Sequence, residues 1–278
     1  MRKTVRSAAI FKGKGLHSGA PVTLRIHPGE DGLLIRRGRG VFRASWDNVS
    51  PSSLCTLIRS PDDPSLSLST TEHLMAALGA LGVTDAVIEV SGPEVPILDG
   101  SALPFLLGVQ DAGISLLAGQ RERLVITAPV IARDGDAWAG LFPSERFSAS
   151  FSIDFPHPSI GKQSASFDPL LDDFASAIAP ARTFCLGEDV RWMRAAGLAL
   201  GGDGTNAVVF GEGSVEAAGG LRYADEPARH KLLDAFGDLH LAGAEIVGRF
   251  EGHKSGHRMT NELIRAAYAE QARGSIAA

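Results

Sequence analysis

Cysteine and long apolar runs are scarce in this chain of 278 residues. The only two cysteines, Cys55 and Cys185, lie far apart and outside any CxxC pair, so neither a disulfide framework nor a thiolate metal site is predicted. No stretch approaches the roughly 20 apolar residues of a membrane span. The basic start, Met1–Arg6, is not followed by the apolar segment of a signal peptide. We therefore expect a cytoplasmic protein without a transmembrane segment.

An excess of positive charge is also missing. The sequence has 27 Lys and Arg against 32 Asp and Glu, a net charge of -5, and its cations are scattered. Nucleic-acid capture normally uses clustered cations, so nucleic acid is not an expected partner. The HExxH, GxSxG and GxxxxGK[ST] motifs are absent too. Their absence removes the commonest metalloprotease, serine hydrolase and phosphate-loop enzymes.

What the chain does have is a globular composition, with 44% hydrophobic residues, and a repeated order of strands and helices. Short β-branched runs between turn residues predict strands at Val22–Ile26, Leu33–Arg36, Ala86–Val90, Leu124–Ile126, Phe147–Ile153 and Ala207–Phe210. Helical spacing predicts helices after a Ser69 cap up to Gly82, and at Ser101–Gly113, Glu226–Gly243 and Asn261–Arg273. The repeated order indicates two α+β halves joined near Gly119–Arg123.

The predicted helix over Glu226–Gly243 carries the most informative spacing. His230, Asp234 and Asp238 recur every four residues, on a different face from the apolar stripe. That stripe consists of Leu232, Phe236 and Leu239. A histidine and an aspartate one turn apart suit a Zn²⁺ ion if a distant residue completes the set. HxxxD is also a common chance pattern on a solvated helix face, so incidental surface charge stays open as the alternative.

His73, directly after Glu72 at the start of the first predicted helix, is the candidate third ligand. A structural interpretation competes with it. Ser69-Thr70-Thr71-Glu72 fits a capping box, in which the glutamate hydrogen-bonds the beginning of its own helix, and His73 would then be a partly buried histidine. Taken alone, this segment favours the capping box.

Six longer segments carry a further signal. They are Gly15-Leu16-His17-Ser18-Gly19, Thr71-Glu72-His73-Leu74-Met75-Ala76-Ala77-Leu78, Gly92–Ser101, Ala181-Arg182-Thr183-Phe184, Arg229–Leu239 and His253-Lys254-Ser255-Gly256-His257. In sequence and in order they resemble the UDP-3-O-acyl-N-acetylglucosamine deacetylase family of lipid A synthesis. The segments reach from the N-terminal region to the last predicted helix, which makes the resemblance specific.

The resemblance implies one Zn²⁺ ion per chain, held by two histidines and an aspartate that match His73, His230 and Asp234. Fe²⁺ suits the same ligands. Glu72 matches the family's general base, which takes a proton from the attacking water. Thr183 matches a threonine whose hydroxyl stabilises the tetrahedral oxyanion.

The resemblance also gives a role to His257. It matches a protonated histidine that stabilises the oxyanion and is a candidate proton donor to the leaving amine. Asp238 matches its carboxylate partner, and a nearby carboxylate raises the pKa of a histidine. The alternative for His257 is a histidine on a surface loop. Whether Glu72 handles the protons alone or shares them with His257 is open at this stage.

The implied partner is the small-molecule substrate UDP-3-O-acyl-N-acetylglucosamine with its fatty acyl chain. Lys231 matches a lysine that contacts the nucleotide end, Phe184 an aromatic residue near the sugar and uridine, and His17 a position near the substrate. The family's inserted β-α-β unit, which forms an apolar passage for the acyl chain, corresponds to about residues 185–210. The expected lining, with ordinary core packing as the alternative, is Val190, Met193, Leu198, Leu200 and Val209.

This passage is where the chain departs from the family pattern. Cys185 stands where glycine is common, and the stretch Leu200–Ala207 lacks the bulkier residue and the acid that many relatives have. Neither change touches the proposed zinc ligands. The preferred length of the acyl chain is therefore open, whereas the chemistry is not.

The expected fold is α+β, with two similar domains, each a β-sheet layer packed on two helices, together forming a β-α-α-β sandwich with small inserts. Residues 1–119 would carry Glu72 and His73, and residues 120–278 would carry His230 and Asp234. We expect a monomer. Two other functions compete with the deacetylase: a dehydratase of acyl thioesters, which has no use for three zinc ligands, and an inactive binding protein, which would have no need to keep Glu72 and Asp234.

Overall fold

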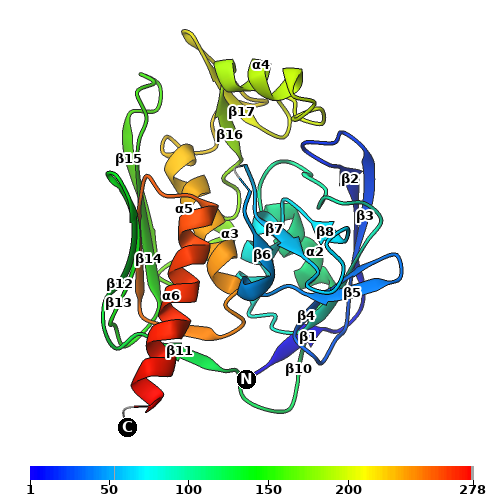
Figure 1. Cartoon of the computed structure of the whole chain (residues 1–278). Helices are drawn as coiled ribbons and strands as arrows, with labels where there is room; N and C mark the ends of the chain where they lie inside the picture. Colours follow the sequence, from blue (N-terminus) through cyan, green and yellow to red (C-terminus); the bar gives the residue numbers. More distant parts are fainter. Residues whose placement is uncertain (53, 277–278) are drawn as a thin grey trace.

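The computed structural model describes residues 1–52 and 54–276, and it shows a four-layered α+β arrangement (Figure 1). Two five-stranded sheets form the outer layers, and the main helices lie between them. These helices are α1 (Glu72–Leu81), α2 (Leu103–Ala112), α5 (Glu226–His240) and α6 (His257–Ile276). Helices α1 and α2 contact each other, as do α5 and α6, and α1 meets α5 in the middle. The predicted β-α-α-β sandwich is confirmed.

The two sheets have the same topology. The first has the order β2 (Ala9–Lys14), β3 (Pro21–His27), β9 (Ala86–Val90), β4 (Leu33–Arg37) and β5 (Gly40–Arg43). The second has the order β12 (Val130–Asp134), β13 (Ala137–Phe142), β20 (Arg249–His253), β14 (Ser148–Asp154) and β15 (Lys162–Phe167). In each, the third strand pairs in parallel with the fourth, and all other pairs are antiparallel. The predicted repetition of strands and helices is therefore correct.

Side-chain alternation explains why these segments form one-sided sheets. Strand β3 buries Val22, Leu24 and Ile26, and β14 buries every second residue from Ala149 to Ile153. A strand whose apolar residues alternate in this way presents one face to the core and the other to water. The helices cover the buried faces, and a continuous hydrophobic core joins the two halves.

Shorter elements connect these layers. They are β1 (Lys3–Val5), η1 (Trp46–Asn48), β6 (Val49–Ser50), β7 (Leu57–Arg59), β8 (Ser67–Leu68), β10 (Ile114–Leu116), β11 (Arg123–Val125), α3 (Phe174–Ala177) and β19 (Glu245–Val247). Strand β1 pairs with β10, β11 pairs with β19, and β6, β7 and β8 form a small sheet. This small sheet brings the segment before β7 close to the start of α1, as the hydrogen bond from the Thr71 amide to the Thr56 carbonyl shows.

The expected β-α-β insert is present at the top of Figure 1. It consists of β16 (Phe184–Leu186), α4 (Gly187–Ala195) and β17 (Val208–Gly211), with β16 parallel to β17. An additional strand, β18 (Ser214–Glu216), extends this sheet. The parallel pairing requires a crossover, and α4 supplies it.

Three helix starts differ from the sequence prediction, and for α2 the start is Leu103 in place of Ser101. Helix α1 begins at Glu72 with Thr71 as its N-cap, and the Ser69 hydroxyl donates instead to the Pro93 carbonyl. Helix α6 begins at His257, four residues before the predicted start at Asn261. In the part of the chain that the structure describes, no helix is long and apolar enough to cross a membrane.

Candidate metal and active site

The site lies where α1 and α5 cross at close range. A side chain on Gly237 of α5 would meet the carbonyl oxygen of Glu72 at 2.1 Å and the amide nitrogen of Ala76 at 3.0 Å. Only a residue without a Cβ therefore fits this crossing. The close approach places the first turn of α1 directly beside the middle of α5.

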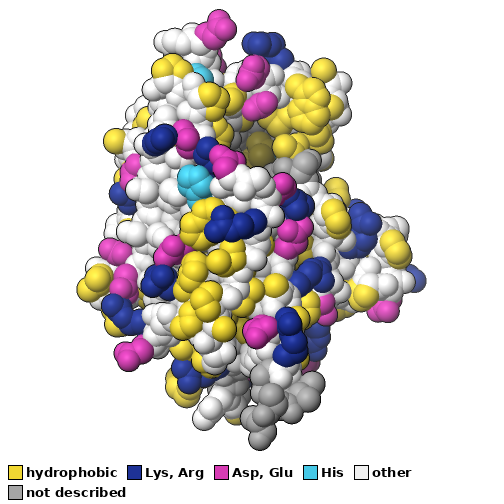
Figure 2. All heavy atoms as spheres, turned by 60° about the vertical axis from the view of Figure 1, so that its left-hand side comes forward, with side chains coloured by type: hydrophobic (Ala, Val, Ile, Leu, Met, Phe, Trp, Pro, Cys, Tyr) yellow, Lys and Arg dark blue, Asp and Glu magenta, His cyan; other side chains and the backbone are white. Residues whose placement is uncertain are grey.

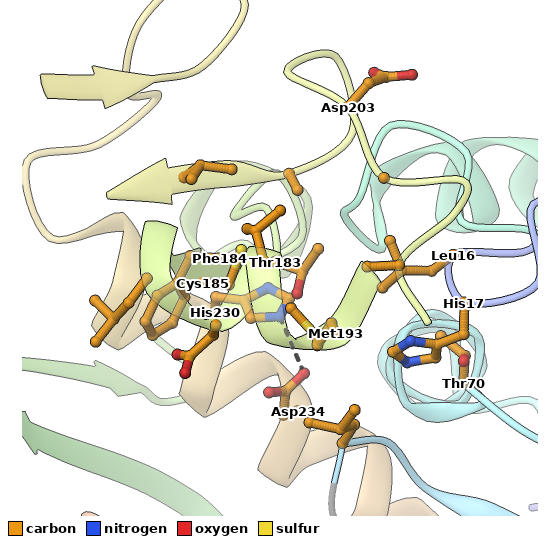
Figure 3. A pocket seen from close by; sticks show the side chains of 18 of the residues that line it. Leu16, His17, Thr70, Thr183, Phe184, Cys185, Met193, Asp203, His230 and Asp234 are labelled. Carbon is orange, nitrogen blue, oxygen red and sulfur yellow. Dashed lines mark ion pairs between the residues drawn. The ribbon is translucent and has the colours of Figure 1, made fainter. Parts of the chain in front are cut away.

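Three candidate ligands from these two helices meet in one buried group. His73 from α1 and His230 and Asp234 from α5 each offer a ligand atom, and these atoms lie within 4.8 Å of one another. The Asp234 Oδ1 atom is 3.3 Å from His230 Nε2 and 3.7 Å from His73 Nε2. Figure 3 shows the ring of His230 directed toward Asp234. The helix face that carries His230, Asp234 and Asp238 is buried, so the alternative of a solvated face is wrong.

The protonation of these residues suits a cation. Burial lowers the pKa of His230, and it lowers the pKa of His73 to about 3, so both rings are neutral near pH 7. The Nδ1 atom of His230 lies 3.0 Å from the Ala181 carbonyl oxygen. Because a carbonyl can only accept, Nδ1 is the donor in this hydrogen bond. In the neutral ring Nε2 then carries the free lone pair, and it faces Asp234. Such a partner on the second ring nitrogen is typical of metal-binding histidines.

Asp234 gives the clearest sign that a cation belongs here. Although burial alone would raise the pKa of its carboxyl, His230 and Lys231 hold it well below its usual range. Its Oδ2 atom accepts from the Lys231 amine at 2.8 Å. Its Oδ1 atom is buried and has no hydrogen-bond partner within the described residues. A buried carboxylate oxygen normally needs a partner, so the residues present fit a metal ion.

Glu72 precedes the candidate ligand His73, and its carboxylate accepts a hydrogen bond from a residue outside α1. Its Oε2 atom accepts from the backbone N–H of Thr56 at 3.0 Å. Within the described residues, the side chain of the N-cap residue Thr71 makes no capping hydrogen bond to the start of α1. The capping-box interpretation is therefore wrong. Burial raises the pKa of Glu72 to about 7; nearby His257 lowers this pKa and Asp234 raises it, and the effect of burial prevails.

His257 lies at the start of α6 and faces Glu72 and Asp238. Its Nδ1 atom donates to Asp238 Oδ2 at 2.8 Å, and its Nε2 atom lies 4.0 Å from Glu72 Oε1. Burial alone would lower the pKa of His257, but Asp238 and Glu72 outweigh it and raise the pKa to about 9. His257 is thus a largely buried residue whose raised pKa favours the imidazolium form, and the surface-loop alternative is wrong.

A cavity of about 490 Å³ opens over this group and extends into the insert. Of the residues predicted for the site and the passage, it is lined by His17, Glu72, His73, Thr183, Phe184, Val190, Met193, Val209, His230, Lys231, Asp234 and His257. Figure 3 shows Thr183 and Phe184 next to His230, with His17 and Leu16 across the cavity. Seen from another side, hydrophobic side chains gather beside a hollow near the top of the molecule (Figure 2).

Lys231 and His17, both predicted to contact the substrate, line the cavity. Lys231 was expected at the nucleotide end, and its amine also reaches Asp234, since residues three apart are neighbours on a helix. His17 donates its backbone N–H to Glu94 Oε1 at 2.8 Å. Its two ring nitrogens are buried without a hydrogen-bond partner in the described chain, and burial lowers its pKa.

Two expected lining residues of the passage are not part of the cavity. Leu198 is outside the described lining, and Leu200 is 57% exposed. Helix α4 ends at Ala195, and the chain then turns back so that the Leu200 amide donates to the His17 carbonyl at 3.1 Å. With the chain turned back after α4, neither residue lines the cavity in this structure.

Sequence reasoning missed other residues at the site. Trp192, Leu186 and Phe155 line the cavity, and the Phe155 ring packs edge-on against Phe184 at 5.5 Å between centroids. Thr56 holds both Glu72 and Asp238 by hydrogen bonds. Phe155 follows a predicted strand and carried no local signal. The contact between Thr56 and Asp238 joins positions 182 apart, so no spacing rule finds it.

Two neutral imidazoles and a carboxylate that leave one side open, next to a buried carboxyl group of raised pKa, form the site of a metal-dependent hydrolase. The family model described as UDP-3-O-acyl N-acetylglycosamine deacetylase matches residues 2–269. The chain belongs to this family.

Relatives that carry the name of this family agree with this assignment. A UDP-3-O-acyl-N-acetylglucosamine deacetylase of Shewanella frigidimarina (strain NCIMB 400) is 44% identical over 278 residues, covering 97% of this chain and 90% of the relative. A protein of the same name from Shewanella sp. (strain W3-18-1) is 43% identical over the same length and the same shares. Such identity over nearly the whole of both chains places the activity of this protein among the amide hydrolases.

Proposed function

We propose that this chain hydrolyses the N-acetyl group of UDP-3-O-acyl-N-acetylglucosamine and releases acetate and UDP-3-O-acyl-glucosamine, an early committed step of lipid A biosynthesis. Membership of the deacetylase family over residues 2–269 supports this. The observation that carries the proposal is the buried group of His73, His230 and Asp234, in which Asp234 Oδ1 has no partner within the described residues.

We propose one metal ion per chain at this group, with Zn²⁺ as the resident ion. Two imidazole nitrogens and one carboxylate oxygen with an open position are the ligand set of catalytic zinc sites, although Fe²⁺ suits the same donors. When bound, Zn²⁺ supplies a Lewis acid that acidifies water and polarises the scissile carbonyl. Lys231 would hold Asp234 in place through its 2.8 Å hydrogen bond.

Glu72 is the proposed general base. Its carboxyl group is next to a ligand in sequence, is buried, and has a pKa raised to about 7. A base of this kind takes a proton most effectively when its pKa is close to the working pH. The hydrogen bond from Thr56 occupies Oε2, so Oε1 is the oxygen left to accept the proton of the attacking water.

His257 is the proposed acid and oxyanion stabiliser. Its contact with Asp238 keeps the imidazolium form, and its Nε2 points toward the same space as Glu72 Oε1. A positive charge aimed at the developing oxyanion lowers the barrier, and the same nitrogen can protonate the leaving amine. Thr183, which lines the cavity close to His230, is the proposed second donor to the oxyanion.

The cavity supplies the remaining contacts. We propose that Lys231 and Phe184 contact the nucleotide and sugar end, that His17 lies beside the sugar, and that the acyl chain enters the insert between Val190 and Val209. Each methylene buried there contributes about 0.8 kcal/mol, which makes the acyl chain a large part of the binding free energy. Leu198 is no longer part of this proposal.

Three further proposals concern the whole molecule. The domain division falls at residues 119 and 120, between the two halves of equal topology. The protein acts as a monomer, which light scattering on the purified protein tests. It acts in the cytoplasm, which fractionation of the source cells tests.

The deciding experiment is acetate release from UDP-3-O-acyl-N-acetylglucosamine by the purified protein, before chelation, after chelation, and after Zn²⁺ is restored. Activity that disappears and then returns supports a metal-dependent deacetylase. Absence of acetate release from a protein that contains its metal would overturn the proposed substrate.

A further inference from the structure

Thr56 contacts the proposed base, Glu72, and also Asp238, the carboxylate partner of the proposed acid His257. Its backbone N–H donates to Glu72 Oε2 at 3.0 Å, and its hydroxyl donates to Asp238 Oδ1. The other oxygen of Asp238 accepts from His257 Nδ1 at 2.8 Å. One residue therefore connects the proposed base on α1 to the proposed acid on α6, directly to Glu72 and through Asp238 to His257.

Thr56 is itself held firmly. Its side chain and backbone are only 1% exposed. Its carbonyl accepts from the amide nitrogen of Thr71 at 3.4 Å and from the Thr71 hydroxyl at 3.3 Å, which fixes the segment against the start of α1. The next residues form β7, whose Ile58 is fully buried. A residue fixed on three sides in this way can set the orientation of its neighbours.

The hydroxyl of Thr56 has a specific consequence for Asp238. A buried carboxylate with one oxygen left unpaired is free to turn about its terminal bond, and the lost hydrogen bond costs free energy. With Oδ1 bound to Thr56, only Oδ2 is left to face His257, so the imidazole ring has a single orientation. That orientation directs Nε2 toward Glu72, 4.0 Å away.

We propose that Thr56 is a positioning residue for the deacetylation: its hydroxyl orients Asp238, and through Asp238 the ring of His257, while its backbone N–H orients Glu72. The inference rests on the proposed function of the site. Thr56 would not touch the substrate and would act only through the carboxylates of Glu72 and Asp238. It belongs to neither helix, and its contact with Asp238 spans 182 positions of the sequence.

The test uses two substitutions that separate the hydroxyl from the rest of the side chain. Thr56→Val keeps the shape and the backbone N–H but removes the hydroxyl, whereas Thr56→Ser keeps the hydroxyl and removes a methyl group. We expect Thr56→Val to lower kcat by about 10-fold to 100-fold, the usual effect of losing such a supporting contact. The KM and the bound metal should stay within about twofold of the unsubstituted protein, and Thr56→Ser should recover most of kcat.

Two additional measurements exclude a merely structural role. In the ¹⁵N-histidine NMR spectrum of the metal-loaded protein, Thr56→Val should change the Nδ1 resonance of His257, and Thr56→Ser should leave it in place. In the background of Asp238→Asn, the same Thr56→Val change should cost little further activity, because both substitutions remove one pathway. A melting temperature for each variant shows that it is folded, and Thr56→Ala replaces Thr56→Val if that variant does not fold.

Several outcomes would overturn the inference. An unchanged kcat in folded Thr56→Val, equal losses in Thr56→Val and Thr56→Ser, or full additivity with Asp238→Asn would each show that the hydroxyl does not act through Asp238. Failure of the proposed function is recognised separately, because the unsubstituted protein would then release no acetate in the same assay.

Discussion

Arg182 and Glu226 form a buried ion pair in which the Arg182 Nε lies 2.9 Å from Glu226 Oε1 and both side chains are 1% exposed. The glutamate also accepts from the backbone amides of Arg182 and Arg222. It is the first residue of α5, where a negative charge is favourable. The pair joins the start of α5 to the segment that contains Ala181, whose carbonyl orients His230.

Breaking this pair should destabilise the protein strongly. Glu226→Ala leaves a buried guanidinium without its partner, and we expect a loss of about 3–5 kcal/mol in the free energy of unfolding. Urea denaturation measures this, with the exposed Arg258→Ala as the matched control for loss of a surface ion pair. A loss under about 1 kcal/mol for Glu226→Ala would show that the pair contributes no more than a surface contact.

The same pair predicts a pH dependence of stability. Burial alone would raise the pKa of Glu226, but Arg182 and the amide donors outweigh burial and lower it. A lowered folded-state pKa contributes stability above the unfolded value of about 4.5, and this stability is lost as the pH falls through the folded pKa. In Glu226→Gln, which cannot ionise at this position, this contribution to the loss of stability at acid pH should be absent. A comparison of the urea midpoints of the two proteins below pH 4.5 measures the difference.

The base and the ligand should respond differently to substitution. Glu72→Ala removes the proposed base but no ligand, so we expect the metal to stay bound while kcat falls by at least about 100-fold. Asp234→Ala removes a ligand and should lose both metal and activity. Metal analysis and acetate release measure the two effects, and equal metal loss in both variants would assign Glu72 to the ligand set.

His257, the proposed acid, should determine how activity falls at high pH. Because the pKa of His257 is raised to about 9, activity that needs the imidazolium form should fall as the pH rises through about 9. Asp238→Asn removes the carboxylate that stabilises the charge, so the fall should move to lower pH. The pH dependence of kcat in both proteins tests this, and an unmoved basic limb would show that another group controls it.

A bulky substitution should hinder binding of the acyl chain only at a position that lines the cavity. Val209 lines the cavity, whereas Leu200 lies outside its described lining and is 57% exposed. Val209→Trp should raise KM for substrates with long acyl chains by about 10-fold or more and affect short-chain substrates much less. Leu200→Trp is the matched control and should behave like the unsubstituted protein. Equal effects on long and short chains would place the acyl group elsewhere.

Much of the fold was predictable because its signals are local. Alternation in β3 and β14 and the helical spacing around His230 are read from neighbouring residues. The start of α1 was not, since the hydrogen bond that occupies Glu72 comes from Thr56, sixteen positions away. Local patterns allowed a capping box there, and only the folded chain shows that the glutamate is turned toward the site.

In the candidate site, too, contacts within one helix were predictable from the sequence and contacts between helices were not. The i to i+4 spacing of His230 and Asp234 was visible in the sequence, but the pairing with His73 depended on resemblance to a family, since it arises from two helices crossing at Gly237. The contact of Lys231 with Asp234 follows from helix geometry and was overlooked. Leu198 lies outside the cavity lining because the chain after α4 turns back onto residues 16 and 17, a contact that no local pattern predicts.

The ligands proposed for the metal come from two helices, one from α1 and two from α5. An ion held this way binds only when the two helices are docked, and a ligand that binds only the folded state stabilises it as its free concentration rises. The bound ion would then add to the stability of the fold as well as supply its chemistry. The denaturant midpoint of unfolding would rise with the free metal concentration and fall after chelation.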